Sequence, residues 1–237
     1  MRNRIVYIAT LAFIMLFSSC GNSGRKHKNP KTQKTKTNID VKLSSNTEAM
    51  SSAEIFKRYN SAVFMVFTSD GYNAFQGSGF FISSSGIAVS NYHVFKGTSV
   101  GLETIKLSSD EELNIQEVIA KSDKDDFIIF KVAKKNNRSF NYIPITQKTS
   151  FIGEKVYAIG SPRGLENTFS SGEISQKRDN NIIQISVPID HGSSGGALIN
   201  SYGEAIGITS GGRDDSGANL NFAIDIKVIR EVLNKQH

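Results

Sequence analysis

The sequence has a single cysteine, Cys20, so no disulfide can form within the chain. Small exported domains often depend on disulfides because their apolar cores are small. Here the fold must be stabilised by its apolar core alone. A domain of about 180 residues remains after the N-terminal segment, and a domain of that size buries enough surface to be stable. The lack of cysteine therefore excludes a disulfide-rich scaffold.

The N-terminal apolar run is too short to form a typical transmembrane helix. It covers residues 5–17, whereas a transmembrane helix needs about 20 residues. Arg2 and Arg4 precede the run and small serines follow it, which is the order of a secretory signal. We therefore predict a signal peptide over residues 1–19.

Cys20 follows this signal directly. The segment resembles a bacterial lipoprotein signal, in which the cysteine becomes the first residue and is lipidated. A lone exported cysteine has no disulfide partner and needs another explanation. The prediction is a lipid-anchored protein on the periplasmic or outer face of a bacterial membrane. The alternative is an ordinary signal peptide whose cysteine is incidental.

Acidic residues are absent before residue 38, where eight basic residues lie. Removing these from the 28 basic residues leaves 20 against 22 acidic ones, a net charge of −2 for the rest. The overall charge of +6 is therefore no sign of nucleic-acid binding. Residues 20–50 have few large apolar side chains, which predicts a flexible basic linker. This linker is expected to be a solvated spacer, or to lie along the anionic headgroups of membrane lipids.

Residues 51–237 contain many short segments rich in β-branched and aromatic residues and separated by turn residues. Helices are expected only near the ends, at 52–59 after a capping box at Ser51 and Glu54, and at 225–235. This pattern predicts an all-β barrel or sandwich, with a joint near residues 146–153. The expected strands are 63–68, 77–82, 86–90, 99–106, 113–120, 127–132, 155–159, 170–176, 182–187, 197–200, 205–211 and 220–223.

Ser194 is surrounded by glycines in the segment Gly192-Ser193-Ser194-Gly195-Gly196, which continues into an apolar strand. Glycines allow a tight turn with unusual dihedral angles. Such a turn can aim the N–H groups of Gly192 and Ser194 at one point beside the hydroxyl. Acyl transfer needs that arrangement, because the tetrahedral intermediate carries negative charge on oxygen. A flexible turn is the alternative for this segment alone.

A serine nucleophile needs a base. His27 lies in the basic linker and His237 is the last residue, so neither is held rigidly. His191 is too close to Ser194 along the loop. His93 remains, at the end of an apolar strand, where it can face a cleft. A packed and hydrogen-bonded histidine fits this segment equally well.

The third group must be a carboxylate that orients the imidazole. Asp126 directly precedes the apolar strand 127–132, so it is expected to be rigid and partly buried. Asp123 and Asp125 are rivals that fit solvated turn positions better. The residues thus predict a set in the order His93, Asp126, Ser194.

Seven segments, in register and in order between about Ser61 and Val228, resemble the trypsin-like serine proteases, and specifically the protease domain of the HtrA/Deg family. Asn91-Tyr92-His93-Val94 resembles the family's Asn-x-His-Val, and residues 192–198 its Gly-Asn-Ser-Gly-Gly-Ala-Leu. The chain departs from the family at Ser193, for Asn, and at Asp225, for Pro. The seven segments are 78–82, 91–94, 126–132, 158–165, 170–175, 192–198 and 221–224.

The resemblance implies an all-β fold of two six-stranded β-barrels of the chymotrypsin/trypsin type, over about 60–145 and 150–226. It implies a serine endopeptidase acting on exported or misfolded proteins, with catalytic His93, Asp126 and Ser194. The oxyanion hole would be formed by the backbone of Gly192 and Ser194. No PDZ domain is expected, because no sequence follows residue 237.

The expected substrate pocket is apolar, since Pro188 stands where digestive trypsin-like enzymes place a buried aspartate. Its other walls are expected from His191, Thr209, Ser210 and Gly211. No cofactor or metal is predicted, because the remaining histidines are not at ligand spacing from acids or the cysteine. The alternative function is a catalytically silent, protease-like binding or scaffold lipoprotein.

Overall fold

The structure is a computed structural model, and it describes residues 41, 44, 47–99, 101–134, 138–161, 167–213 and 220–235. These residues belong to one compact unit, Asn38–His237. The predicted signal peptide (1–19), Cys20 and most of the predicted linker lie outside the described residues. None of the helices in the described ranges has both the length and the apolar character needed to cross a bilayer.

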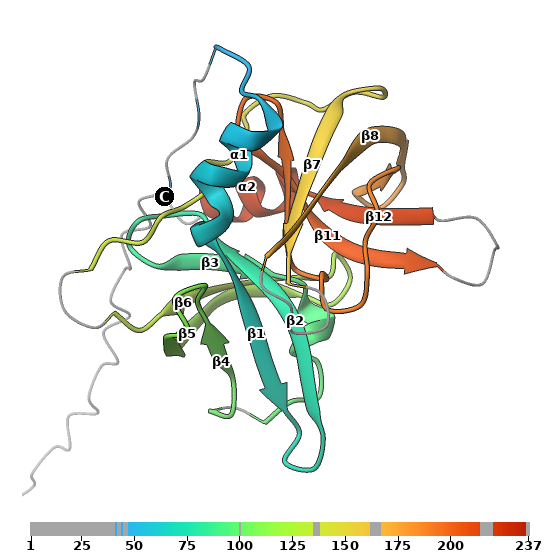
Figure 1. Ribbon diagram of the computed structural model, residues 1–237. Helices are drawn as coiled ribbons and strands as arrows, with labels where there is room; N and C mark the ends of the chain where they lie inside the picture. Colours follow the sequence, from blue (N-terminus) through green and yellow to red (C-terminus); the bar gives the residue numbers. More distant parts are fainter. Residues whose placement is uncertain are drawn as a thin grey trace, which may run out of the picture. The chain divides into compact units, whose positions relative to one another are not determined.

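The first six strands form a closed antiparallel barrel in the order β1-β2-β3-β6-β5-β4 (Figure 1). Phenylalanines fill its interior: Phe64 and Phe81 lie with ring centroids 4.7 Å apart, and Phe130 packs edge-on against Phe64. These large rings occupy alternate, inward-facing positions of their strands. The strands are β1 (Val63–Ser69), β2 (Ala74–Phe81), β3 (Ile87–Ser90), β4 (Thr104–Lys106), β5 (Glu112–Ser122) and β6 (Phe127–Val132).

The next six strands form a second closed barrel in the order β10-β11-β12-β9-β8-β7 (Figure 1). Its interior holds aliphatic side chains, among them Val156, Ile183 and Leu198. The prediction of two six-stranded β-barrels is therefore confirmed. The strands are β7 (Lys155–Gly160), β8 (Thr168–Arg178), β9 (Ile182–Ile185), β10 (Ala197–Asn200), β11 (Ala205–Arg213) and β12 (Leu220–Asp225).

The strand boundaries differ from the predicted ones where turns intervene. The predicted strand 99–106 is shortened to β4, because the chain turns at Gly101, whose φ is 93°. Conversely, β5 and β8 are longer than expected, since bulges in their pairing with β6 and β9 let the strands continue around the barrel. Local composition does not reveal such bulges.

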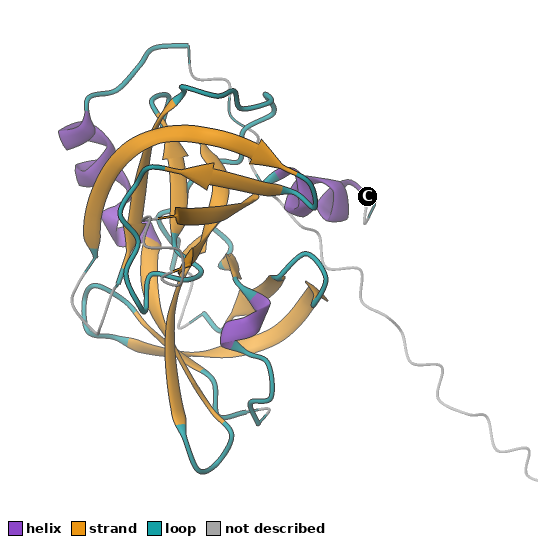
Figure 2. Ribbon diagram, turned by 90° about the vertical axis from the view of Figure 1, so that its right-hand side faces the viewer, coloured by secondary structure: helices purple, strands orange, loops and turns teal. Residues whose placement is uncertain are grey.

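Two short α-helices flank the barrels (Figure 2). α1 (Ser52–Tyr59) begins with the predicted capping box: the Ser51 N–H donates to Glu54 Oε2 at 2.8 Å, and the Glu54 N–H donates to Ser51 Oγ. The Ser51 hydroxyl and N–H also lower the pKa of the Glu54 carboxyl. α2 (Lys227–Asn234) begins two residues later than predicted, because Asp225 ends β12 and accepts a hydrogen bond from the Lys227 N–H.

One apolar cluster connects both barrels with both helices. Ile55 from α1, Phe80 from the first barrel, Ile145 from the connection, Ile159 from the second barrel and Ile229 from α2 all belong to it and are fully buried. Burying one such side chain contributes about 1.5–3 kcal/mol. This burial holds the barrels together, and the loops at their junction are positioned by it.

Candidate active site

His93 lies in a single 3₁₀ turn, η2 (Tyr92–Val94), which follows β3. Its backbone N–H donates to Asp126 Oδ1 at 2.9 Å, and its ring atom Nδ1 lies 2.8 Å from Asp126 Oδ2. An ionised carboxylate can only accept, so opposite ionised Asp126 the Nδ1 atom carries the proton. Nε2 is then left as the basic nitrogen. The imidazole is 46% exposed and can be reached from solvent.

Asp126 occupies a strained backbone position between β5 and β6. Its φ is 49°, in the left-handed region, which costs a non-glycine residue about 1–2 kcal/mol. Asn91 holds it there, because Asn91 Nδ2 donates to the Asp126 carbonyl at 3.0 Å. The Asn91 side chain is buried, and its Oδ1 has no hydrogen-bond partner among the described residues. The Asn91 amide therefore bonds to the Asp126 carbonyl through Nδ2 while its own Oδ1 is buried without a partner among the described residues.

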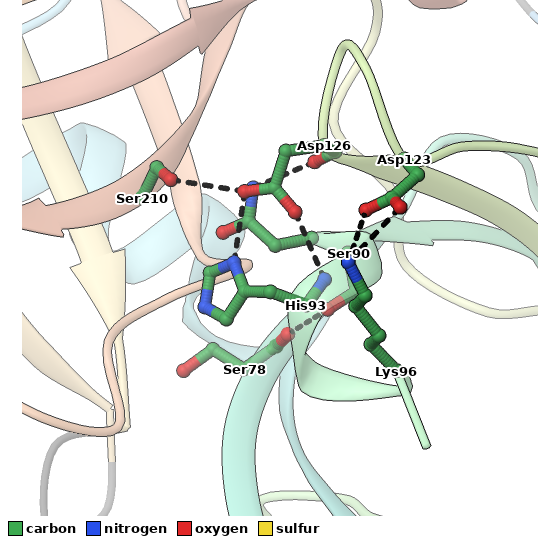
Figure 3. A network of polar contacts seen from close by, with 8 residues as sticks. Ser78, Ser90, His93, Lys96, Asp123, Asp126 and Ser210 are labelled. Atoms are coloured by element: carbon green, nitrogen blue, oxygen red, sulfur yellow. Dashed lines mark hydrogen bonds and ion pairs between the residues drawn. The ribbon is translucent and has the colours of Figure 1, made fainter. Parts of the chain in front are cut away.

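The two rival aspartates lie in other interactions. Asp123 forms an ion pair with Lys96 at 3.0 Å on the surface, and this hydrogen bond raises the pKa of the Lys96 ammonium (Figure 3). Asp125 accepts from Ser122 Oγ and from Asn181 Nδ2, each at 3.0 Å. Asn181 directly precedes β9, so Asp125 connects the first barrel to the second. Only Asp126 of the three contacts the imidazole.

Ser210 also approaches Asp126. Its hydroxyl donates to Asp126 Oδ2 at 3.2 Å, so that oxygen is contacted by both Ser210 and His93 (Figure 3). Ser210 comes from β11 of the second barrel, whereas Asp126 and His93 come from the first. The sequence placed Ser210 in the pocket wall and gave no signal for this contact. It arises only when the two barrels pack together.

The loop that carries Ser194 turns through two glycines in the left-handed region. Gly192 and Gly195 both have φ near 92°. The Gly195 N–H donates to the Thr209 carbonyl, and the Thr209 hydroxyl donates to the Ser193 carbonyl, both at 2.7 Å. In a trans peptide the C=O and the next N–H point in opposite directions. The N–H of Ser194 therefore points away from Thr209.

His93 and Ser194 line the same cavity, which has a volume of about 400 Å³. A Cβ added to Gly211 would lie 3.5 Å from Ser194 Oγ, so the hydroxyl faces Gly211 across this cavity. Two segments far apart in sequence are thereby brought together around a space large enough for part of a peptide. The cavity is lined by Phe75, Gln76, His93, Val94, Ile189, Asp190, His191, Gly192, Ser194, Ser210, Gly211 and Gly212.

Two of the five predicted pocket residues lie elsewhere. Pro188 is exposed, and its carbonyl accepts from Ser170 Oγ at 2.9 Å, while Thr209 is buried beneath the Ser194 loop. Ile189 and Asp190, the two residues after Pro188, line the cavity instead. Residues 188–190 lie in an irregular segment after β9, so no alternation along a strand predicts which of them faces the cavity.

No group of three or more metal-ligating side chains occurs in the described ranges. The residues brought together are instead an imidazole, a carboxylate, a hydroxyl and backbone N–H groups of a glycine-rich turn. This set can transfer protons and hold an anionic oxygen.

Comparisons with known proteins agree with this site. The profile of the trypsin-like peptidase domain matches residues 77–208. A probable periplasmic serine endoprotease, DegP-like, of Rhizobium meliloti is 32% identical over 169 residues, and the match covers 67% of this chain and 32% of that protein. Protease Do-like 1, chloroplastic, of Arabidopsis thaliana is 29% identical, with 67% and 38% covered. The chain thus spans about a third of the length of these curated relatives.

A solved structure is similar as well. The serine endoprotease from Yersinia pestis superposes with a TM-score of 0.69 at 27% identity, over 80% of this chain and 67% of that one. The likeness extends across both barrels, since the match covers most of the described residues.

The Ser194 loop predicts a specific sensitivity at Gly195. Gly195→Ala would bring the new methyl group into overlap with the Ser78 carbonyl oxygen and the Ser90 hydroxyl. We expect it to reduce the free energy of unfolding by about 1–3 kcal/mol more than Gly71→Ala does. Gly71 is the matched control, because its φ is 93° and a Cβ there meets nothing within 4 Å. Urea denaturation of both variants measures the difference, and equal losses would contradict the close packing.

Proposed function

Because the chain belongs to the trypsin-like peptidase domain family, we propose that it is a serine endopeptidase that works through an acyl-enzyme intermediate. The observation that carries the proposal is one cavity lined by His93, hydrogen-bonded to Asp126, and by Ser194. A hydroxyl, an imidazole and a carboxylate are the groups that nucleophilic acyl transfer requires. The similarity to DegP-like endoproteases supports the same reaction.

In the proposed reaction, Ser194 Oγ attacks the carbonyl carbon of the peptide bond while its proton moves to His93 Nε2. The tetrahedral intermediate collapses as the C–N bond breaks, and His93 returns the proton to the leaving amine. Water then attacks the acyl-enzyme by the same route and releases the acid. Asp126 keeps the proton on Nδ1 and stabilises the imidazolium that forms transiently.

The negative charge of the intermediate is proposed to be held by the N–H groups of Gly192 and Ser194. Support comes from the loop geometry: the Ser193 carbonyl is held by Thr209, and the Ser194 N–H points the other way. Removing one such donor costs about 10²–10³-fold in turnover in related sites.

The test of this function is covalent labelling with a serine-directed fluorophosphonate. We expect wild-type chain to be labelled and to hydrolyse an unfolded protein such as casein, and Ser194→Ala to do neither. Asp126→Asn should lower kcat by about 10⁴-fold, because the imidazole loses the partner that fixes its tautomer. Asp123→Asn is the matched control and should leave kcat unchanged. Wild-type chain that is folded but unlabelled would instead indicate a silent, protease-like binding protein.

The proposed substrate pocket accepts a small or aliphatic side chain. Ile189 and Val94 supply apolar surface to the cavity. Asp190, the one acidic residue among the described residues that line it, accepts a hydrogen bond from the His191 N–H at 2.7 Å through Oδ1. Cleavage of a peptide library, read by mass spectrometry, should show Ala, Val or Leu most often before the cleaved bond. Cleavage mainly after Lys or Arg would refute this specificity.

We further propose that the mature protein is anchored in a bacterial cell envelope by lipid on Cys20 and acts on exported or misfolded proteins. The periplasmic naming of the relatives supports export. In a bacterial host, an alkyne fatty-acid analogue should label the wild-type chain and the control Ser23→Ala, but not Cys20→Ser. Equal labelling of Cys20→Ser would remove the anchor from the proposal.

A further inference from the structure

Ser78 connects the first barrel to the loop of the proposed nucleophile. It lies in β2 and is fully buried. Its backbone N–H donates to the Ser194 carbonyl at 2.7 Å, and its hydroxyl donates to the Gly192 carbonyl, also at 2.7 Å. One residue of the first barrel therefore holds carbonyls on both sides of the Ser193 peptide in the second barrel.

The direction of the hydroxyl bond is fixed by a second neighbour. The Ser161 N–H lies 2.9 Å from Ser78 Oγ and can only donate. The hydroxyl accepts that bond, so its single proton is directed to the Gly192 carbonyl. Ser161 is held in turn, because Gln76 Nε2 donates to its carbonyl at 2.9 Å.

The backbone of Ser78 is also fixed. The Ser90 hydroxyl donates to the Ser78 carbonyl at 2.7 Å, just before the strand leads to His93 (Figure 3). That carbonyl lies so close to Gly195 that a side chain there would overlap it. Ser78 is thus placed by its own barrel and by contact with the opposite one.

Gly192 needs such a contact. A glycine adopts left- and right-handed conformations about equally readily, so its φ of 92° is not selected by its own sterics. The hydrogen bond from Ser78 Oγ to the Gly192 carbonyl and the bond from the Ser193 N–H to the Asp190 carbonyl, at 3.0 Å, together fix the peptide that follows Gly192. The Gly192 N–H, a proposed oxyanion donor, belongs to the preceding peptide and is oriented from this fixed peptide through the dihedral angles of one glycine. The donor's aim would then depend on a hydroxyl from the other barrel.

We propose that the Ser78 hydroxyl is a positioning residue for the oxyanion hole, acting through the Gly192 carbonyl. The inference rests on the proposed function and adds to it a residue that does not touch the substrate. It also makes catalysis depend on the native distance between the barrels, because the bond crosses their junction.

The experiment compares Ser78→Ala and Ser78→Cys with wild type in steady-state hydrolysis of a peptide substrate. Cysteine keeps an atom at the γ position and is somewhat larger than serine but only a weak donor, whereas alanine removes that atom, so a loss shared by both variants is due to the hydrogen bond and not to a cavity. We expect kcat to fall about 10–10²-fold in both variants with KM within about twofold, since a misplaced donor costs less than a deleted one. The matched control is Ser83→Ala, because Ser83 is equally buried but bonds to Ser85 in the β2–β3 turn.

Binding of inhibitors distinguishes positioning from general damage. A peptide aldehyde, which forms an anionic tetrahedral adduct, should bind Ser78→Ala more weakly by the same factor as kcat falls. The corresponding peptide alcohol, which forms no covalent adduct and carries no negative charge at that position, should bind as to wild type. A structural defect would weaken both ligands together.

Several outcomes would overturn the inference. These are wild-type kcat in Ser78→Ala and Ser78→Cys, an equal loss in Ser83→Ala, or parallel weakening of aldehyde and alcohol binding. If Ser78→Ala does not fold, the kcat of Ser78→Cys alone tests the inference. If the wild-type chain is folded but is neither labelled nor hydrolytic, the proposed function fails and this inference fails with it. If the wild-type chain is active and both Ser78 variants keep its kcat, only the inference fails.

Discussion

The site depends on the contact between two barrels that are each complete by themselves. Both barrels are closed, so neither has a free sheet edge through which to join the other. They meet through the shared apolar cluster and through polar bonds at the junction, among them the bond from the Ser78 N–H to the Ser194 carbonyl, at 2.7 Å. The groups of the proposed mechanism come from both barrels, and the contact at this junction sets the distances between them.

The division of chemistry follows from that architecture. The first barrel supplies an acid–base pair that is already assembled, with two contacts between His93 and Asp126 and a strained Asp126 backbone supported by Asn91. The second barrel supplies the hydroxyl and the glycine turn, with Thr209 fixing the Ser193 peptide. Ser210 is the exception, because it reaches from the second barrel to the acid of the first. Packing of the two barrels therefore completes the surroundings of the Asp126 carboxylate and those of the Ser194 hydroxyl.

Much of the fold could be predicted because its signals are local. The runs around Val63, Phe127 and Ala197 are strands because β-branched and aromatic residues favour pleated, buried positions, and Ser51 with Glu54 starts α1. The residues His93, Asp126 and Ser194 could be selected by type and by position at strand ends. The pocket could not be derived in this way: Pro188 is exposed and Ile189 lines the cavity, and both lie in the irregular segment after β9, where no alternation along a strand predicts which side chain faces inward.

By itself, the sequence determined the strand and helix segments, the absence of disulfides, and the kinds of reactive group with their order along the chain. Only the tertiary structure decided that Asp126 rather than Asp123 or Asp125 meets the imidazole, that Ser210 turns to the same carboxylate, and that Ser78 bonds across to Gly192. The physical reason is range. Propensity, capping and alternation act over a few residues, whereas these contacts join residues separated by 33 to 114 positions and exist only after two cores have packed together.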